Sequence, residues 1–275
     1  MINAVSIDLE FWYSGEPFSN YLKDKVDTQI EDSTDFLLAL LNKYNVRATF
    51  FVLGELAEGY PSLIKMIHKQ GHEISSHGYS HKKLYMLNKD SFEKELKKSI
   101  EILESITGEK PIGFRAPNFS LDNSTKWVFR TLEKYGFKYD SSIFPIKTQF
   151  YGVPNAPLEP YKLSMDDITK IDDNSKIIEF PLSVVKIIKN VPIAGGFYFR
   201  ILPFSFIRLA IKKVNKDRPI IVYIHPWEIY PKTPKVNIPF PINFLSYYKM
   251  ESVLKKFENI LKNFKFAPIK EVLQI

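Results

Sequence analysis

Short apolar runs alternate along this chain with longer segments that are apolar on one side only. The short runs, rich in β-branched and aromatic residues, predict strands at Val5–Asp8, Ala48–Leu53, Glu73–Ser76, Ile112–Arg115, Tyr139–Ser142, Ile177–Phe180 and Ile220–Ile224. The longer segments predict helices at Ser33–Tyr44, Pro61–Lys69, Lys89–Thr107, Ser124–Tyr135, Pro203–Val214 and Leu245–Phe264. Ser33 is the expected N-cap of the first helix.

Strands that alternate with helices predict a parallel sheet. About seven such units and no GxGxxG turn favour a closed α/β barrel over an open doubly wound sheet. Residues 149–175, rich in proline and turn formers, break the alternation, so we expect an irregular excursion over the barrel mouth. We find no internal repeat and interpret residues 1–275 as a single domain.

Composition narrows the class of protein only modestly. Among 275 residues, 45% are hydrophobic and 25% are charged, which is typical of a folded chain. The absence of cysteine excludes disulfides, thiolate-metal sites and a cysteine nucleophile. The 38 basic and 31 acidic residues give a net charge of +7, which we interpret as a lysine-rich solvated surface, and no nucleic-acid partner is expected.

The start of the chain lacks the pattern of a signal peptide, so a cytoplasmic location is expected. No apolar run approaches the ~18–20 residues that a membrane span requires, so no transmembrane segment is expected. The proline-broken apolar stretch Pro239–Leu245 is compatible with peripheral contact to a membrane surface or with a cover over the core. The oligomeric state stays open.

Polar residues of the types that catalyse reactions or bind metals cluster where the predicted strands end. Asp8 and Glu10 end the first strand, His77 follows the third, Arg115 ends the fourth and His225 follows the last. In a parallel α/β barrel the carboxyl ends of the strands form the active-site face. We therefore expect these side chains to share one mouth.

The spacing of the acids and histidines favours a metal site. Asp8 and Glu10 point to the same face of an extended segment, so one could bind a cation while the other stays free as a base. His77 and His81 share one face if their segment forms a helical turn, and with one carboxylate they make a two-histidine, one-carboxylate ligand set. The alternatives are solvated acids and a polar loop.

Two further residues have both structural and catalytic interpretations. Arg115, in an otherwise apolar strand, requires a nearby anion, and Asp8 is its natural partner. The pair could equally be a salt bridge of structural value only. His225, within "VYIHPWE", is either a core histidine or a proton donor.

Eight stretches taken in order resemble the polysaccharide deacetylases with the NodB-type domain. They are "SIDLEFW", "ATFFVLGELAE", "GHEISSHGYSH", "GFRAPNFS", "YDSSIFP", "IIEFPLS", "AGGFYFRILP" and "VYIHPWEI". The likeness is greatest to a subgroup with a D-x-E first motif and an H-P-W-E last motif. The resemblance implies a distorted (β/α)7 barrel and a metal-dependent hydrolase, often a zinc enzyme, that removes acetyl groups from N-acetylated sugars.

The resemblance also implies a role for each motif residue. Glu10, His77 and His81 would hold one divalent transition metal, Zn2+ first and Co, Ni or Fe as alternatives. Asp8 would be the general base, oriented by Arg115. The choice between Asp8 and Glu10 as ligand stays open, because family members carry adjacent aspartates there.

The leaving-group side of the site is implied in the same way. His225 would protonate the leaving amine, with a nearby acid such as Asp140 raising its pKa. The main-chain N–H of Asn118 would help to hold the oxyanion. Tyr223 stands where members usually place leucine in a pocket for the acetyl methyl group.

Aromatic residues near these motifs suggest a platform for sugar rings. We expect Trp12, Tyr198 and Trp227, together with Arg200, to bind the substrate, although aromatic residues beside strand ends are more often core. Gly195 and Gly196 indicate a close approach of the backbone to a ligand, or a turn.

The leading prediction is an intracellular N-deacetylase acting on a polysaccharide, an oligosaccharide or a carrier-linked glycan precursor. The first alternative is a hydrolase of a non-sugar C–N bond, such as a ureide or a cyclic imide, on the same fold. The second alternative is a catalytically silent glycan-binding module.

Overall fold

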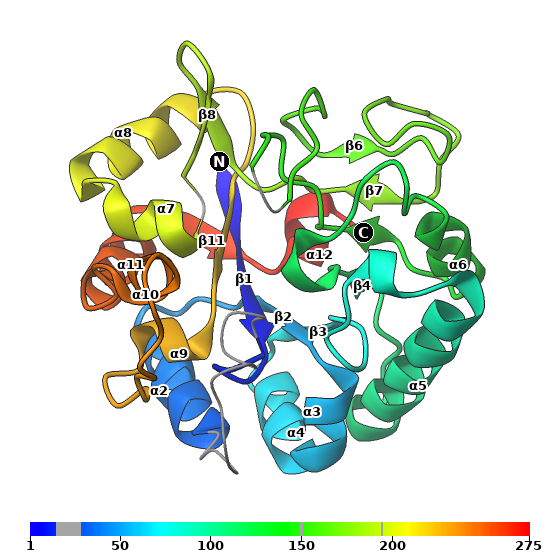
Figure 1. Cartoon of the computed structure of the whole chain (residues 1–275), viewed down its shortest axis with the longest axis horizontal. Coiled ribbons are helices and arrows are strands. Elements are labelled where there is room, and N and C mark those ends of the chain that lie inside the picture. The colour runs from blue at the N-terminus through cyan, green and yellow to red at the C-terminus, as the bar shows by residue number, and fades with distance from the viewer. Residues whose placement is uncertain (15–28, 149–150, 194) are drawn as a thin grey trace.

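A curled sheet of mainly parallel strands forms the centre of the protein (Figure 1). The computed structural model describes residues 1–14, 29–148, 151–193 and 195–275. Seven parallel strands follow in the order β10 (Ile221–Ile224), β1 (Ile2–Leu9), β2 (Thr49–Val52), β3 (Glu73–Ser76), β4 (Gly113–Phe114), β5 (Tyr139–Asp140) and β7 (Ile178–Glu179). This arrangement confirms the predicted α/β class and the seven strand positions.

Four further strands complete the described β-structure. β6 (Tyr161–Lys162) pairs antiparallel with β7 and comes from the predicted excursion at 149–175. β11 (Lys265–Ala267) lies parallel beside β1. β8 (Val184–Lys186) and β9 (Asn190–Pro192) form a separate hairpin. Among the described strands the pairing runs from β10 to β6 without joining its ends, so the barrel is a partial one.

Helices surround this sheet (Figure 1). They are α2 (Ile30–Lys43), α3 (Gly54–Gly59), α4 (Pro61–Lys69), α5 (Lys89–Thr107), α6 (Val128–Lys134), α7 (Gly196–Ile201), α8 (Phe204–Val214), α9 (Pro226–Ile229), α10 (Ile242–Tyr247), α11 (Ser252–Asn263) and α12 (Ile269–Leu273), with single-turn helices η1 (Leu84–Met86) and η2 (Pro117–Phe119). Among the described residues, no helix combines the length and apolar character needed to cross a bilayer.

Local sequence signals fix α5, which has the predicted bounds. The Asn88 side chain accepts a hydrogen bond from the Ser91 N–H, and the Ser91 hydroxyl oxygen accepts one from the Asn88 N–H, so two otherwise unpaired donors are satisfied at the helix start. Gly108 ends the helix at φ 77°, a conformation that costs glycine little.

Three predicted helix boundaries are wrong. α6 begins at Val128 and not at Ser124, because residues 123–127 form turns. The other two differ for local reasons. α2 begins at Ile30, so Ser33 lies inside the helix, where its hydroxyl is buried and donates to the Ile30 carbonyl at 3.2 Å. The predicted helix Leu245–Phe264 is divided into α10 and α11, because Lys249 between them adopts φ 53°.

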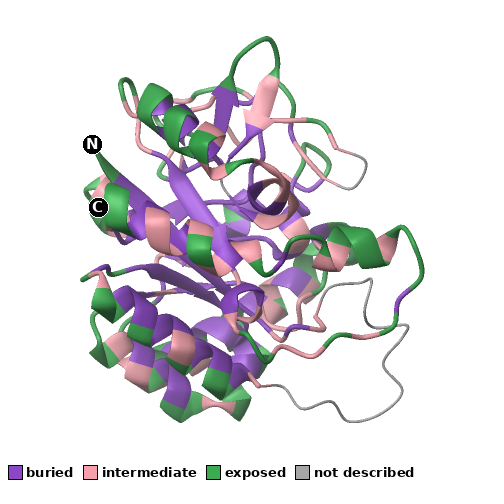
Figure 2. Cartoon of the chain, turned by 90° about the vertical axis from the view of Figure 1, so that its left-hand side faces the viewer, coloured by how far each residue is buried: buried purple, intermediate pink, exposed green. Residues whose placement is uncertain are grey.

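The alternation of β1 determines which side chains enter the site. Val5, Ile7 and Leu9 point into the main apolar cluster beneath the surrounding helices. Ser6 and Asp8 therefore point to the opposite face, toward the interior of the curl. Figure 2 shows that buried residues fill the sheet and the inward faces of the helices. Ser6 and Asp8 are therefore polar side chains in a buried environment.

Candidate active site

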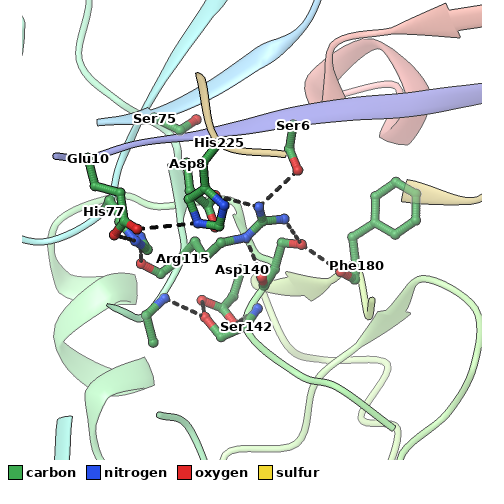
Figure 3. A network of polar contacts seen from close by, with 12 residues as sticks. Ser6, Asp8, Glu10, Ser75, His77, Arg115, Asp140, Ser142, Phe180 and His225 are labelled. Carbon is green, nitrogen blue, oxygen red and sulfur yellow. Dashed lines mark hydrogen bonds and ion pairs between the residues drawn. The ribbon is translucent and has the colours of Figure 1, made fainter. Parts of the chain in front are cut away.

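Figure 3 shows the polar side chains that gather at the carboxyl ends of the strands. Asp8 and Glu10 come from the end of β1, His77 follows β3, Arg115 follows β4 and His225 follows β10. Four of the five are at least 94% buried, and the His225 side chain is 16% exposed. The structure thus brings together side chains that are up to 217 positions apart in the sequence.

Glu10, His77 and His81 present three ligand atoms to one point. These atoms lie within 4.8 Å of one another. The Glu10 Oε2 atom is 2.5 Å from His81 Nε2 and 3.9 Å from His77 Nε2. Two imidazole nitrogens and one carboxylate are a donor set that divalent transition metals prefer.

The tautomer of His77 is set by its second nitrogen. His77 Nδ1 lies 2.8 Å from the main-chain oxygen of Arg115, which can only accept, so Nδ1 carries the proton. Nε2 is left with its lone pair directed toward Glu10. This outer hydrogen bond is the arrangement that orients metal-binding histidines, and the residues present therefore fit a metal ion.

His77 and His81 do not lie on a helical turn, contrary to the prediction from their spacing. The residues between them form an irregular loop after β3, in which Gly78 has φ 77° and His81 has φ 57°. The two rings nevertheless lie 5.5 Å apart. Backbone turns in the loop, and not helical periodicity, place them together.

The charge states of Glu10 and His77 suit metal binding, whereas burial would lower the pKa of His81 but the charge and hydrogen bond of Glu10 raise it. Burial would raise the pKa of Glu10, but the charge and hydrogen bond of His81, with the neighbouring histidines, lower it to about 2. Burial lowers the pKa of His77 to about 4. At neutral pH Glu10 is therefore an anion and His77 is neutral.

Arg115 is fully buried beneath Asp8 and uses all three of its nitrogens. Its Nη1 donates to Asp8 Oδ1 at 2.6 Å and to Ser6 Oγ at 2.9 Å, while Nε and Nη2 donate to the main-chain oxygen and hydroxyl of Ser141 at 2.8 and 2.9 Å. The guanidinium also lies 4.1 Å from the Phe51 ring centre. Asp8 is the partner that the sequence predicted.

His225 is held between two carboxylates. Its Nδ1 lies 3.0 Å from Glu228 Oε2, and its Nε2 lies 3.3 Å from Glu10 Oε1. Burial would lower the pKa of His225, but the hydrogen bond to Glu228 and the nearby negative charges raise it to about 9.

Sequence reasoning missed Glu228 and assigned its role to Asp140. Asp140 instead accepts hydrogen bonds from the hydroxyl and N–H of Ser142, at 2.8 and 3.0 Å, and faces the buried Glu179. Glu228 stands three residues after His225 in "HPWE", and the N–H of His225 also donates to it at 3.1 Å. That spacing at the start of α9 was the available signal.

The expected substrate-binding residues separate into two groups. Trp227 stacks on His225, with ring centres 4.9 Å apart, and Asn118 follows β4 at φ 53° in η2. No described residue accepts a hydrogen bond from the Asn118 N–H. Tyr198 is half-buried and packs edge-on to Phe144.

Trp12 and Arg200 are occupied in packing instead. Trp12 is 97% buried in a small cluster with Ile238. Arg200 is also buried, and its guanidinium donates to the carbonyl oxygens of Leu245 and Ser246 at the end of α10. The structure therefore does not bring these two side chains into the polar cluster.

The close backbone approach expected at Gly195 is to Tyr223 of the protein itself. A β-carbon at Gly195 would lie 2.3 Å from the main-chain oxygen and 2.6 Å from a ring carbon of Tyr223. Tyr223 in turn packs edge-on to Phe119, 5.1 Å away. The glycine is thus required for Tyr223 to reach its position beneath the site.

Two family models match consecutive parts of the chain. Residues 24–139 match the polysaccharide deacetylase family, and residues 141–274 match a domain of unknown function, DUF3473. A peptidoglycan deacetylase from Helicobacter pylori is 39% identical over 107 residues, which are 39% of this chain and 36% of that protein. The chain spans 36% to 55% of the length of the first three curated relatives. These matches support the polysaccharide deacetylase family.

Two solved structures share the fold over nearly the whole chain. A candidate polysaccharide deacetylase from Mycobacterium smegmatis has a TM-score of 0.61 at 21% identity, covering 99% of this chain and 90% of that one. Puue allantoinase has a TM-score of 0.61 at 14% identity, covering 99% and 88%. At these identities the likeness establishes the mixed α/β fold with its curled sheet and nothing further.

Proposed function

We propose that this chain is a metal-dependent hydrolase that removes the acetyl group from an N-acetylated sugar. One observation carries the proposal: the histidine–carboxylate ligand set shares one site with Asp8 and His225, each of which is held by a separate partner. Asp8 is held by Arg115, and His225 is held by Glu228. The sequence matches to deacetylases support the sugar substrate.

Glu10, His77 and His81 would hold the metal, most simply Zn2+. When bound, such an ion polarises the amide carbonyl and makes its water more acidic. The protein's part is to keep Glu10 ionised and His77 in the correct tautomer, which the buried contacts described above achieve.

Asp8 acts as the general base. Arg115 engages its Oδ1 atom, so Oδ2 is the oxygen that accepts a proton from the attacking water. The fixed guanidinium keeps the carboxylate oriented before the reaction. The hydroxyl then forms its bond to the amide carbon, and the carbonyl oxygen becomes an oxyanion that the Asn118 N–H can stabilise.

His225 completes the reaction on the other side. As the C–N bond breaks, His225 donates a proton from Nε2 to the departing nitrogen, so that the sugar leaves as an amine and the acyl group as acetate. Glu228 accepts from Nδ1 and stabilises the protonated ring for this step. Trp227, stacked on the ring, restricts its orientation.

A non-sugar C–N hydrolase is the second candidate function. The fold favours neither candidate, because the allantoinase and the deacetylase structures have the same TM-score of 0.61. The sequence matches favour the sugar. A silent binding module accords poorly with a site in which ligand set, base and acid are all present.

The decisive experiment measures acetate release from N-acetylated monosaccharides, nucleotide-sugars and oligosaccharides, with ureides and cyclic imides as the competing panel. Turnover is expected only with metal and only on the acetylated sugars. His225→Ala should retain the metal and lose turnover, while His68→Ala, on the outer face of α4, should retain both. Protein that gains no activity from added zinc or cobalt contradicts the proposal.

A further inference from the structure

The segment from Ile229 to Met250 exposes an unusual amount of apolar surface. Phe240 is 83% exposed, and Phe244, Leu245 and Tyr248 are 40%, 37% and 38% exposed. α10, which carries two of them, has no buried residue. Together with Ile238 and Asn243, the aromatic side chains line an open groove of about 460 Å3. Exposed apolar patches of this kind mark interaction surfaces.

The same segment carries only positive charge. Between Ile229 and Met250 there is no Asp or Glu, and the side chains of Lys232, Lys235 and Lys249 are exposed. Over residues 180–250 there are eleven Lys or Arg against two Asp or Glu, whereas the rest of the chain has 27 against 29. The excess positive charge is therefore confined to residues 180–250.

The buried side chains of the segment pack against residues next to the candidate active site. Ile238 is buried against Trp12, and Ile242 and Trp227 pack on the same cluster. Trp227 is the residue that stacks on His225. In Figure 1, α10 lies beside α7, α9 and α11, and α9 is the helix that begins directly after His225. The exposed patch and the catalytic histidine are thus on two sides of one small cluster.

From these observations we infer that the exposed face of residues 229–250 binds the surface of an anionic lipid bilayer. Exposed aromatic residues with flanking lysines and no acids are suited to the boundary between headgroups and acyl chains. Each lysine near an anionic membrane surface adds to binding. Charge argues against a second copy of the chain as the occupant, because two such faces would bring like charges together.

The inference specifies a substrate class, and that step rests on the proposed function. With Phe240 and Phe244 in the headgroup region, the mouth beside His225 and Trp227 lies next to the membrane. The N-acetylated sugar is then one that is attached to a lipid, and the groove lined by Phe240, Phe244 and Tyr248 can hold part of its apolar chain. Soluble sugars remain substrates, but they are less efficient ones.

Sedimentation with lipid vesicles tests the inference and requires no turnover. The purified full chain is mixed with vesicles of phosphatidylcholine alone or of phosphatidylcholine with phosphatidylglycerol. Binding is expected only to the anionic vesicles and should weaken as salt rises. Each of two variants should reduce the partition coefficient about tenfold or more. They are Phe240→Ser with Phe244→Ser, and Lys232→Gln with Lys235→Gln and Lys249→Gln.

Matched controls remove similar side chains elsewhere. Ile171 is 59% exposed, so Ile171→Ser controls for the loss of an exposed apolar residue. Lys65→Gln with Lys69→Gln and Lys110→Gln controls for the loss of three charges. Both controls should bind vesicles like the wild-type chain, and all variants should keep its melting temperature.

Three results overturn the inference: no binding to anionic vesicles, equal binding by the Phe240 and Phe244 variant, or a dimer in solution that this variant converts to a monomer without any vesicle binding. Acetate release from a water-soluble oligosaccharide is measured in parallel. Vesicle binding without acetate release contradicts the proposed function alone, whereas release without vesicle binding contradicts the membrane inference alone.

Discussion

Glu228 accepts hydrogen bonds from both the main-chain N–H and the ring Nδ1 of His225, at 3.1 and 3.0 Å. The bond from the main chain fixes the carboxylate, and the fixed carboxylate then fixes the ring. Because Glu228 is 95% buried, solvent screens this interaction little. The hydrogen bond to Glu228 and the nearby negative charges raise the pKa of His225 to about 9 despite its burial, so the ring is protonated at neutral pH.

Replacing Glu228 with glutamine should therefore weaken the acid step. The pKa of His225, raised to about 9, should fall toward its ordinary value, so the protonated ring should be lost at lower pH. We expect kcat to fall by about 10²–10⁴ near neutral pH, the range typical of general acid catalysis, and the basic limb of the pH–rate profile to move down. Metal content should not change. A variant with an unshifted basic limb would show that Glu228 only positions the ring.

A metal-binding assay should distinguish the roles of Asp8, in β1, and Glu10, directly after it. Glu10 lies 2.5 Å from His81 Nε2, whereas Asp8 is engaged by Arg115. Glu10→Gln should therefore lower metal affinity by more than the ~10–100-fold that loss of an outer-shell partner causes. Asp8→Asn should retain the metal and lose turnover. Equal metal loss in both variants, measured by elemental analysis after dialysis, would assign Asp8 to the ligand set as well.

The buried pair Asp140 and Glu179 should make stability depend on pH. Burial and the charge of Asp140 raise the pKa of Glu179 well above its ordinary value. The folded state thus holds a proton that the unfolded chain has released, so stability is greatest below the unfolded pKa and declines as pH rises through the folded one. The decline is about 1.4 kcal/mol per pH unit in that window.

Glu179→Gln should flatten this dependence, because the amide stays neutral. Urea unfolding at about pH 5 and about pH 8 measures the difference. The variant is expected to gain stability over the wild-type chain as pH rises. Asp173→Asn, an exposed acid in the same half of the chain, should leave the slope unchanged. Parallel slopes for Glu179→Gln and the wild type would show that the pair is not the source.

Gly195→Ala tests the contact beneath the site. Its β-carbon would overlap the main-chain oxygen of Tyr223 at 2.3 Å, so the backbone of β10 or of Gly195 must shift. We expect a loss of about 1–3 kcal/mol in the free energy of unfolding, the usual cost of overpacking. Gly59→Ala, where nothing lies within 4 Å, is the control and should be neutral or slightly stabilising. Equal stability of the two variants would mean that the backbone at Gly195 can shift without a measurable free-energy cost.

Elements with strong local signals could be predicted from the sequence. α4 (Pro61–Lys69), α5 and β3 have the predicted bounds, because proline, an N-cap with its partner, and a terminal glycine act through near neighbours. Buried alternation likewise revealed the strands that carry Asp8, Arg115 and His225. These signals operate within a few residues, and a sequence displays them directly.

Contacts between distant residues could not be predicted in the same way. The helical interpretation of His77 to His81 failed because loop backbone angles, and not periodicity, bring the rings together. Asp140 was expected near His225, but its partners Ser142 and Glu179 come from its own strand end and from the neighbouring strand. Trp12 and Arg200 have side chains that suit sugars, yet packing on Ile238 and α10 occupies them.

The strands that pair with β1 have a consequence for the order in which the chain folds. On one edge β1 pairs with β10, and on the other it pairs with β11 and β2. Residues from the last fifth of the sequence therefore complete the hydrogen bonds of the strand that carries Asp8 and Glu10. The hydrogen bonds of β1 cannot all form until β10 and β11 are available to pair with it. Because these pairings join positions more than 200 residues apart, we expect them to form late in folding.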